Sequence, residues 1–225
     1  MKRKFLTLLL TLGVVGSAHA QFGGLLGGAR GGGGGGDVGA LVDEFNRDSV
    51  LIRETVSRSL MQIVAALGDK EQIAKVKATN DSLSKNTDAK EVGSIQGTFI
   101  KDQSAVAQQL LDSADAKAKM EKLAPEMQKK VGQSILNVGI AGLRIPVMLE
   151  KGRRAIEGVG SNPMMITRLV PIKDGVSLFA ETLPKMTQIA STGFKLMREV
   201  KMDPGSPTAS SKTETVEVAF GDDPK

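Results

Sequence analysis

A serine and a lysine three residues apart, Ser82 and Lys85, are the nearest approach in this sequence to a catalytic motif. On a helix, this spacing places the lysine amine one turn from the serine hydroxyl, where an uncharged amine can act as a base. The other motifs that accompany such a pair in penicillin-binding enzymes are missing from the chain, and the stretch around Lys85 is polar. We therefore expect no catalysis by this pair.

Histidine and cysteine, which most often carry acid–base, nucleophilic and metal chemistry, are almost absent. The chain has no Cys, and its only histidine, His19, lies in a segment that we expect to be removed. The usual ligands for zinc, copper or haem are then missing. Asp43, Glu44 and Asp48 could offer oxygens to calcium, but a helix brings too few of them to one point. We predict no cofactor and no metal site.

Carboxylate chemistry is the remaining enzymatic route. Paired Asp and Glu residues hydrolyse glycosides, but they do so in clefts lined by aromatic rings that stack on sugars. The chain has no Trp and no Tyr. A hydrolase using Ser–Lys or carboxylate chemistry is therefore the least favoured hypothesis, and we predict that the protein is not an enzyme.

Residues 1–20 have the layout of a cleavable secretory signal. A short basic segment precedes an apolar run over residues 5–16, and small residues, Ala18 and Ala20, occupy the −3 and −1 positions before Gln21. The apolar run is shorter than the roughly 20 residues that a helix needs to span a bilayer. We predict cleavage between Ala20 and Gln21, and a periplasmic or secreted protein.

The charge of the exported chain differs from that of the full chain. The signal contains three of the 30 basic residues and none of the 25 acidic ones, so the remainder is close to neutral. A nearly neutral protein with few aromatic rings has neither the charge nor the stacking surfaces that nucleic acid requires. We predict no nucleic-acid partner.

Helical periodicity extends over most of residues 37–202. The first helix shows it best. Phe45, Ile52, Val56 and Ile63 are separated by seven, four and seven residues, which places them on one face of a helix. The pattern predicts helices over 37–67, 70–85, 89–123 and 125–149, a short one ending near Gly158, another over 162–170, and a last one over 173–201.

Local signals set the expected ends of these helices. Asp69 and Asp88 each precede a capping-box sequence, and Pro125 suits a first turn. Proline inside a helix removes a hydrogen bond. We therefore expect Pro146 to kink or end its helix and Pro171 to interrupt another.

The predicted fold is all-α: an elongated bundle of four to five helices over residues 37–202. Residues 21–36 include six consecutive glycines and predict a flexible linker. From residue 203 onward, Pro, Ser, Thr and Gly predominate, which predicts a disordered tail over 203–225.

Two segments are candidates for contact with a partner. Residues 135–149 are the most apolar part of the exported chain, and they form either a core helix or a membrane-docking segment. The basic residues near this segment are candidates for binding a partner or a lipid surface: Arg144, Lys151, Arg153 and Arg154. In the tail, residues 213–220 alternate polar and apolar side chains, so a partner's sheet edge is a candidate contact for Val216, Val218 and Phe220.

These patterns favour a non-enzymatic binding or adaptor protein of the bacterial cell envelope. Its partner is expected to be a protein of the envelope or a second copy of the chain. The alternative is a membrane-active protein that inserts or docks through residues 135–154.

Overall fold

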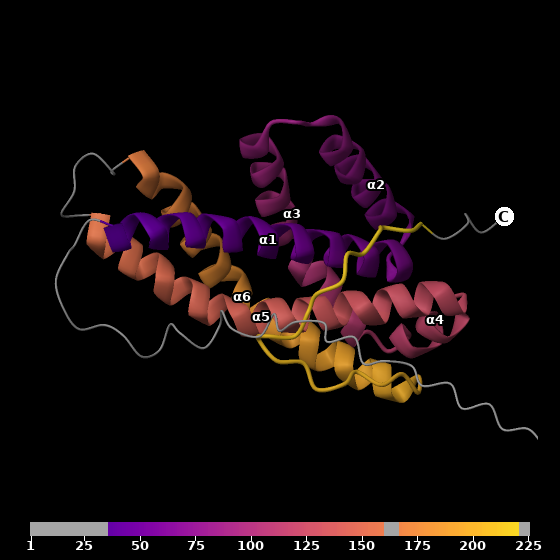
Figure 1. The fold of residues 1–225 in the computed structure, drawn as a ribbon. Coiled ribbons are helices and arrows are strands. Elements are labelled where there is room, and N and C mark those ends of the chain that lie inside the picture. Colours follow the sequence, from indigo (N-terminus) through magenta and orange to yellow (C-terminus); the bar gives the residue numbers. More distant parts are fainter. Residues whose placement is uncertain (1–35, 160–166, 221–225) are drawn as a thin grey trace, which may run out of the picture. The chain divides into compact units, whose positions relative to one another are not determined.

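The computed structural model describes residues 36–159 and 167–220 of the chain, which belong to one compact unit, Gly34–Lys225. These described residues form helices and no strand, so the predicted all-α class is confirmed (Figure 1). The predicted signal, including Ala18, Ala20 and Gln21, and the glycine-rich linker up to residue 35 lie outside the described residues.

The described residues contain six helices. Their bounds are α1 (Gly36–Leu67), α2 (Lys70–Lys85), α3 (Ala89–Asp112), α4 (Ala116–Lys122), α5 (Pro125–Val159) and α6 (Leu169–Glu199).

The capping residues expected from the sequence form hydrogen bonds at the starts of α2 and α3. The Asp69 carboxylate accepts the Gln72 N–H at 2.9 Å, and the Gln72 side chain accepts the Asp69 N–H at 2.9 Å, which forms the predicted capping box. At α3, Asp88 accepts the N–H groups of Lys90 and Glu91. The Glu91 carboxylate instead accepts a hydrogen bond from the Asn86 side chain, so this second box is only half formed.

Several predicted helix ends were wrong. The helix predicted over 89–123 is divided, because the Ser113 hydroxyl donates to the Leu110 carbonyl at 2.8 Å and Ser113 leaves the helical conformation. Pro146 does not end α5, because it lies on the solvent side, where water can satisfy the carbonyl that loses its partner. Pro171 lies in the first turn of α6, where a missing N–H breaks no bond.

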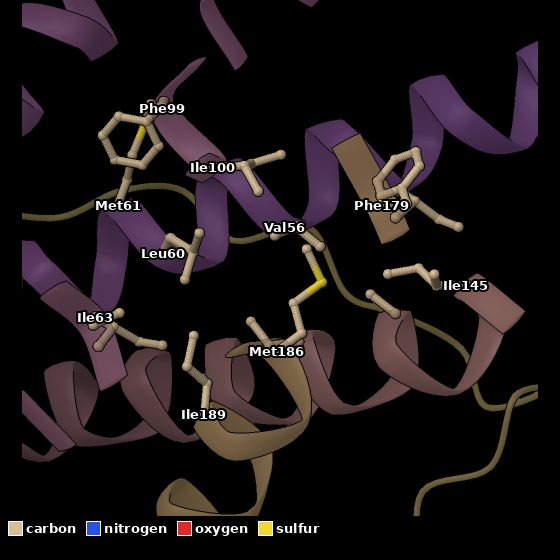
Figure 2. Close-up of a cluster of buried hydrophobic side chains, with 14 of the residues drawn as sticks. Val56, Leu60, Met61, Ile63, Phe99, Ile100, Ile145, Phe179, Met186 and Ile189 are labelled. Atoms are coloured by element: carbon tan, nitrogen blue, oxygen red, sulfur yellow. The ribbon is translucent and has the colours of Figure 1, made fainter. Parts of the chain in front are cut away.

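The core is formed by the four long helices. α5 packs against α1 on one side and α6 on the other, while α3 packs against α1 and α6. α1 and α5 are antiparallel, since Lys151 of α5 pairs with Glu44 near the start of α1 and Met127 contacts Gln62 near its end. Figure 2 shows part of the aliphatic core: Val56, Leu60, Met61 and Ile63 of α1, Phe99 and Ile100 of α3, Ile145 of α5, and Phe179, Met186 and Ile189 of α6.

Glycines on two helices make room for the Phe45 side chain of α1. A β-carbon on Gly152 of α5 would lie 2.7 Å from the Phe45 ring, and one on Gly175 of α6 would lie 3.1 Å from it. Real side chains do not approach as closely as 2.7 Å, and a contact of 3.1 Å is tighter than most, so glycine at these two positions lets the ring lie between the two backbones without a shift. Phe45 is fully buried there and links three helices at one point.

The end of α6 turns the chain back toward the bundle. The N–H of Met202 donates to the Met197 carbonyl at 2.8 Å, and the N–H of Lys201 donates to the Arg198 carbonyl at 3.0 Å. Lys201 has a φ of 62°, so the helix ends in a Schellman motif with lysine where glycine is usual. The Met202 side chain then packs on Gly132 of α5 and directs the following residues along that helix.

The Phe45 contact predicts opposite effects for the same substitution at two glycines of α5. Gly152→Ala should lower the free energy of unfolding by about 1–2 kcal/mol, because the added methyl group overlaps Val176 and Phe45. Gly142→Ala should raise it by about 0.5–1 kcal/mol, because nothing lies within 4 Å of the added carbon and alanine favours the helix. Urea denaturation measures both. Equal changes in the two variants would contradict the packing of Phe45 against α5.

Candidate peptide-binding site

After α6, the chain crosses α5 and α1 in an extended form, and its last described residue, Phe220, lies against α2 (Figure 1). No helix or strand forms in residues 203–220, but this part of the tail is attached to the helices by specific contacts. We call the residues that bind the tail backbone, namely Gln62, Lys130, Asn137 and Arg144, the tail site.

The side-chain amide of Asn137, on α5, binds the backbone of Glu214 both as a donor and as an acceptor. Its side-chain NH₂ donates to the Glu214 carbonyl at 2.8 Å, and its side-chain oxygen accepts the Glu214 N–H at 3.2 Å. Only 1% of Asn137 is exposed, so this amide would be costly to bury without partners. The tail supplies those partners, in the way that a neighbouring strand would.

Gln62 of α1 repeats the arrangement five residues later in the tail. Its side-chain oxygen accepts the Ala219 N–H at 2.7 Å, and its NH₂ group lies 3.4 Å from the Ala219 carbonyl. Gln62 is fully buried. Two buried amides on two helices therefore each bind the backbone N–H and C=O of one residue of an extended chain, and these contacts do not depend on a tail side chain.

Two basic residues of α5 bind further tail carbonyls. The Arg144 guanidinium donates to the carbonyls of Ala209 and Ser211 at 2.8 and 2.7 Å, and the Lys130 amine donates to the Glu217 carbonyl at 3.3 Å. Hydrogen bonds from charged donors are stronger than neutral ones. These contacts extend the tail site over residues 209–219 of the tail.

The three apolar tail residues singled out in the sequence all contact the bundle of their own chain. Val216 is buried, and Val218 and Phe220 pack partly buried against the core. The Lys77 amine of α2 lies 5.4 Å from the centre of the Phe220 ring, within range of a cation–π interaction. Contact of these residues with another protein stays a prediction.

The tail does not fill the space along its path. A cavity of about 160 Å³ lies on one side, lined by Leu51 and Thr55 of α1 together with tail residues 213–216. A second, of about 230 Å³, lies beside Lys129 and Gln133 of α5 and tail residues 214–217. The site therefore has room for larger side chains than those it now holds.

Comparison with known proteins found no matching family, no similar curated protein and no similar solved structure.

The other basic residues predicted to contact a partner have partners within the bundle or face solvent. Lys151 binds Glu44 and Asp48 at 2.8 and 3.3 Å, with only 13% of its side chain exposed. Burial acts to lower the pKa of Lys151, but the hydrogen bonds and charges of the two carboxylates outweigh it and raise the pKa. Arg154 pairs with Glu150 one turn earlier at 3.0 Å, and Arg153 is exposed.

The apolar segment 135–149 forms the middle of α5. Among the described residues, α5 is the one helix long and apolar enough to cross a membrane, and 61% of its most apolar window is buried within the fold. Leu143 and Val147 are exposed on the same helix, by 47% and 51%. The core interpretation accounts for most of the segment but not for this exposed pair.

The Ser-x-x-Lys pair lies at the end of α2. Both Ser82 and Lys85 are exposed there. The acidic residues considered as calcium ligands bind basic residues instead: Glu44 and Asp48 bind Lys151, and Asp43 binds Arg168. Within the described ranges, no group of three or more His, Cys, Asp or Glu side chains is placed to hold a metal ion.

Sequence reasoning overlooked Gln62 and Asn137, the central residues of the tail site. A signal was present, because each is a single polar residue in an apolar run, Leu60–Val64 and Ile135–Val138. A polar side chain on a buried stripe requires a hydrogen-bond partner. The partner lies 77 or 157 residues away, which local patterns do not reveal.

Replacing Asn137 by leucine should release the tail. The variant loses two hydrogen bonds to Glu214 and leaves the peptide group without its partner. We expect trypsin to cleave after Lys212, which is exposed in the tail, about tenfold faster than in the unmodified protein, as expected for a local stability loss of about 1.4 kcal/mol. Mass spectrometry of timed digests measures the rate.

Gln188→Leu is the matched control, because Gln188 is an exposed amide on α6. Its cleavage rate should equal that of the unmodified protein. If Asn137→Leu and Gln188→Leu were cleaved at the same rate, the amide contact with Glu214 would not hold the tail.

Proposed function

We propose that this chain is an exported, non-enzymatic binding protein of the bacterial cell envelope, and that its tail site binds an extended protein segment. The observation that supports this most is that two buried amides, Gln62 and Asn137, each bind the backbone N–H and C=O of one tail residue, and that these two tail residues are five positions apart. Such contacts give affinity through main-chain hydrogen bonds, while side-chain pockets give specificity.

The contacts of the tail site suit a foreign segment as well as the tail. Because the site binds backbone groups, any extended segment with free peptide groups at the two positions can replace Glu214 and Ala219. An apolar side chain between them would take the buried place of Val216. The two cavities beside the tail allow bulkier neighbours than Thr215 and Glu217.

The tail then sets the affinity that a partner must exceed. A segment joined to its own binding site has an effective concentration of about millimolar for a short flexible link. The link here is short, since Met202 ends the turn after α6 and Ala209 already contacts Arg144. A partner gains access by offering stronger side-chain contacts, or by binding the released tail as well.

A membrane-docking role is the second candidate. It is supported by the length and apolar character of α5 and by the exposed Leu143 and Val147. It is less favoured because Arg144 and Lys151, two of the basic residues that would face anionic lipid, are engaged within the fold.

Binding in trans tests the proposed function. A chain ending at Met202 should bind a labelled peptide of residues 208–220 with a dissociation constant of about 10–100 µM, because the peptide meets the same backbone contacts. Fluorescence anisotropy measures the binding. The full-length chain should bind the peptide far more weakly, since its own tail occupies the site.

The matched control is the same truncated chain carrying Asn137→Leu, which should bind at least tenfold more weakly. Circular dichroism establishes that both truncated chains keep their helices. If a helical truncated chain bound no peptide, or if the Asn137→Leu substitution left its affinity for the peptide unchanged, the proposal would be wrong. Crosslinking of the full chain in intact cells then identifies the partner.

Export is tested separately, by N-terminal sequencing of the protein recovered from the envelope or the medium. We expect the sequence to begin at Gln21, and the glycine-rich residues up to 36 then serve as a tether ahead of the bundle. A sequence that began at Met1 would contradict cleavage of the signal.

A further inference from the structure

A second cavity, of about 290 Å³, is bordered by α1, α2 and α3, and it shares Glu54 and Arg58 with the smaller cavity beside the tail. Its polar side chains include Arg53 and Arg58 of α1, Asn80 of α2 and Gln96 of α3. Met61 and Leu83 are among its apolar lining residues. The cavity therefore combines cationic groups with an apolar wall.

Arg53 is the unusual residue of this cavity. Its guanidinium donates one long hydrogen bond, from Nη1 to the Gly93 carbonyl at 3.5 Å. Its Nε is buried and has no hydrogen-bond partner in the part of the chain that the structure describes. No carboxylate of the described residues lies within 4.0 Å of it. Burial lowers the pKa of Arg53, and the charge of Asp174 acts in the opposite direction.

The structure around Arg53 makes room for the guanidinium without pairing it. A β-carbon on Gly93 would lie 3.0 Å from Nη1, so the absence of a side chain there lets the group lie against α3. A partly buried cation with an unsatisfied N–H destabilises a fold, and an apolar side chain of similar size would be tolerated better. A charge kept at such a position is typical of a binding site.

Arg58, the second cation of the cavity, is already neutralised. Its Nε lies 3.2 Å from the Glu54 carboxylate, in an ion pair that also borders the cavity. Arg53 is therefore the cation of this cavity that has no carboxylate of the described residues within 4.0 Å, and Asp174 acts on it from a longer distance. A single charge matches a carboxylate, whose two oxygens fit the planar donor pattern of arginine, better than it matches a doubly charged phosphate.

We propose that the cavity bordered by Arg53, Met61 and Leu83 binds a small organic monocarboxylate, with the carboxylate on Arg53 and the apolar body against Met61 and Leu83. The cavity lies at the small end of the usual range for ligand sites, which suits a compact acid. Gln96, only 8% exposed, adds an amide that can donate to the same carboxylate.

Isothermal titration calorimetry of the full exported chain with octanoate tests this site. Octanamide is the matched neutral ligand, because it has the same length and the same apolar body. We expect octanoate to bind at least tenfold more tightly than octanamide. Equal affinities would show an apolar cavity without anion selectivity, and no measurable binding of octanoate would also overturn the proposal.

Three variants of the two arginines locate the anion. Arg53→Met should weaken octanoate binding at least tenfold, whereas Arg58→Met, which removes a charge already paired with Glu54, should weaken it less than threefold. Arg53→Lys, which keeps the charge but loses the planar donor pair, should fall between them. Octanoate binding that survived in Arg53→Met would overturn the assignment.

Thermal unfolding supplies a readout that does not depend on the affinity of one ligand. Without ligand, Arg53→Met should unfold at a higher temperature than the unmodified chain, because the unsatisfied group is gone. Octanoate should raise the unfolding temperature of the unmodified chain and leave that of Arg53→Met unchanged. A destabilised Arg53→Met would instead indicate a structural role for the arginine.

Discussion

The packing of Phe45 between Gly152 and Gly175 is the contact on which the rest of the structure depends. It brings the backbones of α1, α5 and α6 together at one point, near the start of α1. With that end fixed and the two helices antiparallel, Gln62 of α1 and Asn137 of α5 lie along the same path of the tail. The placement of the two amides along one extended chain therefore depends on the packing of α1 against α5, to which the ring on these glycine backbones contributes.

The sequence predicted those parts of the fold that local chemistry decides. The Asp69 capping box and the start of α5 at Pro125 are as expected, because each depends on residues within one helical turn. Pro146 does not end α5 and Pro171 does not interrupt α6, since the effect of a proline depends on which side of the helix faces water and on its distance from the first turn. Burial and helix length are set by distant residues.

The candidate site was less predictable from the sequence, because it too depends on residues that are distant along the chain. The alternating pattern of Val216, Val218 and Phe220 indicated an extended segment that needs a surface, and all three pack on the core. The surface itself did not follow from the pattern, because Gln62 and Asn137 give no local sign of what they bind. Arg144 was selected for its charge, and the structure shows its guanidinium on two tail carbonyls.

The buried polar groups of this core differ in where they find their hydrogen-bond partners. The hydroxyls of Ser104, Ser134 and Thr182 donate to carbonyls of their own helices, so they need nothing else. Gln62 and Asn137 bind the tail, so their hydrogen bonds depend on a segment outside their own helices. Arg53 has a buried N–H satisfied by neither. Gln62 and Asn137 thus couple buried amides to a segment outside their own helices, whereas the buried Nε of Arg53, like the hydroxyls of Ser49 and Ser59, has no hydrogen-bond partner among the described residues.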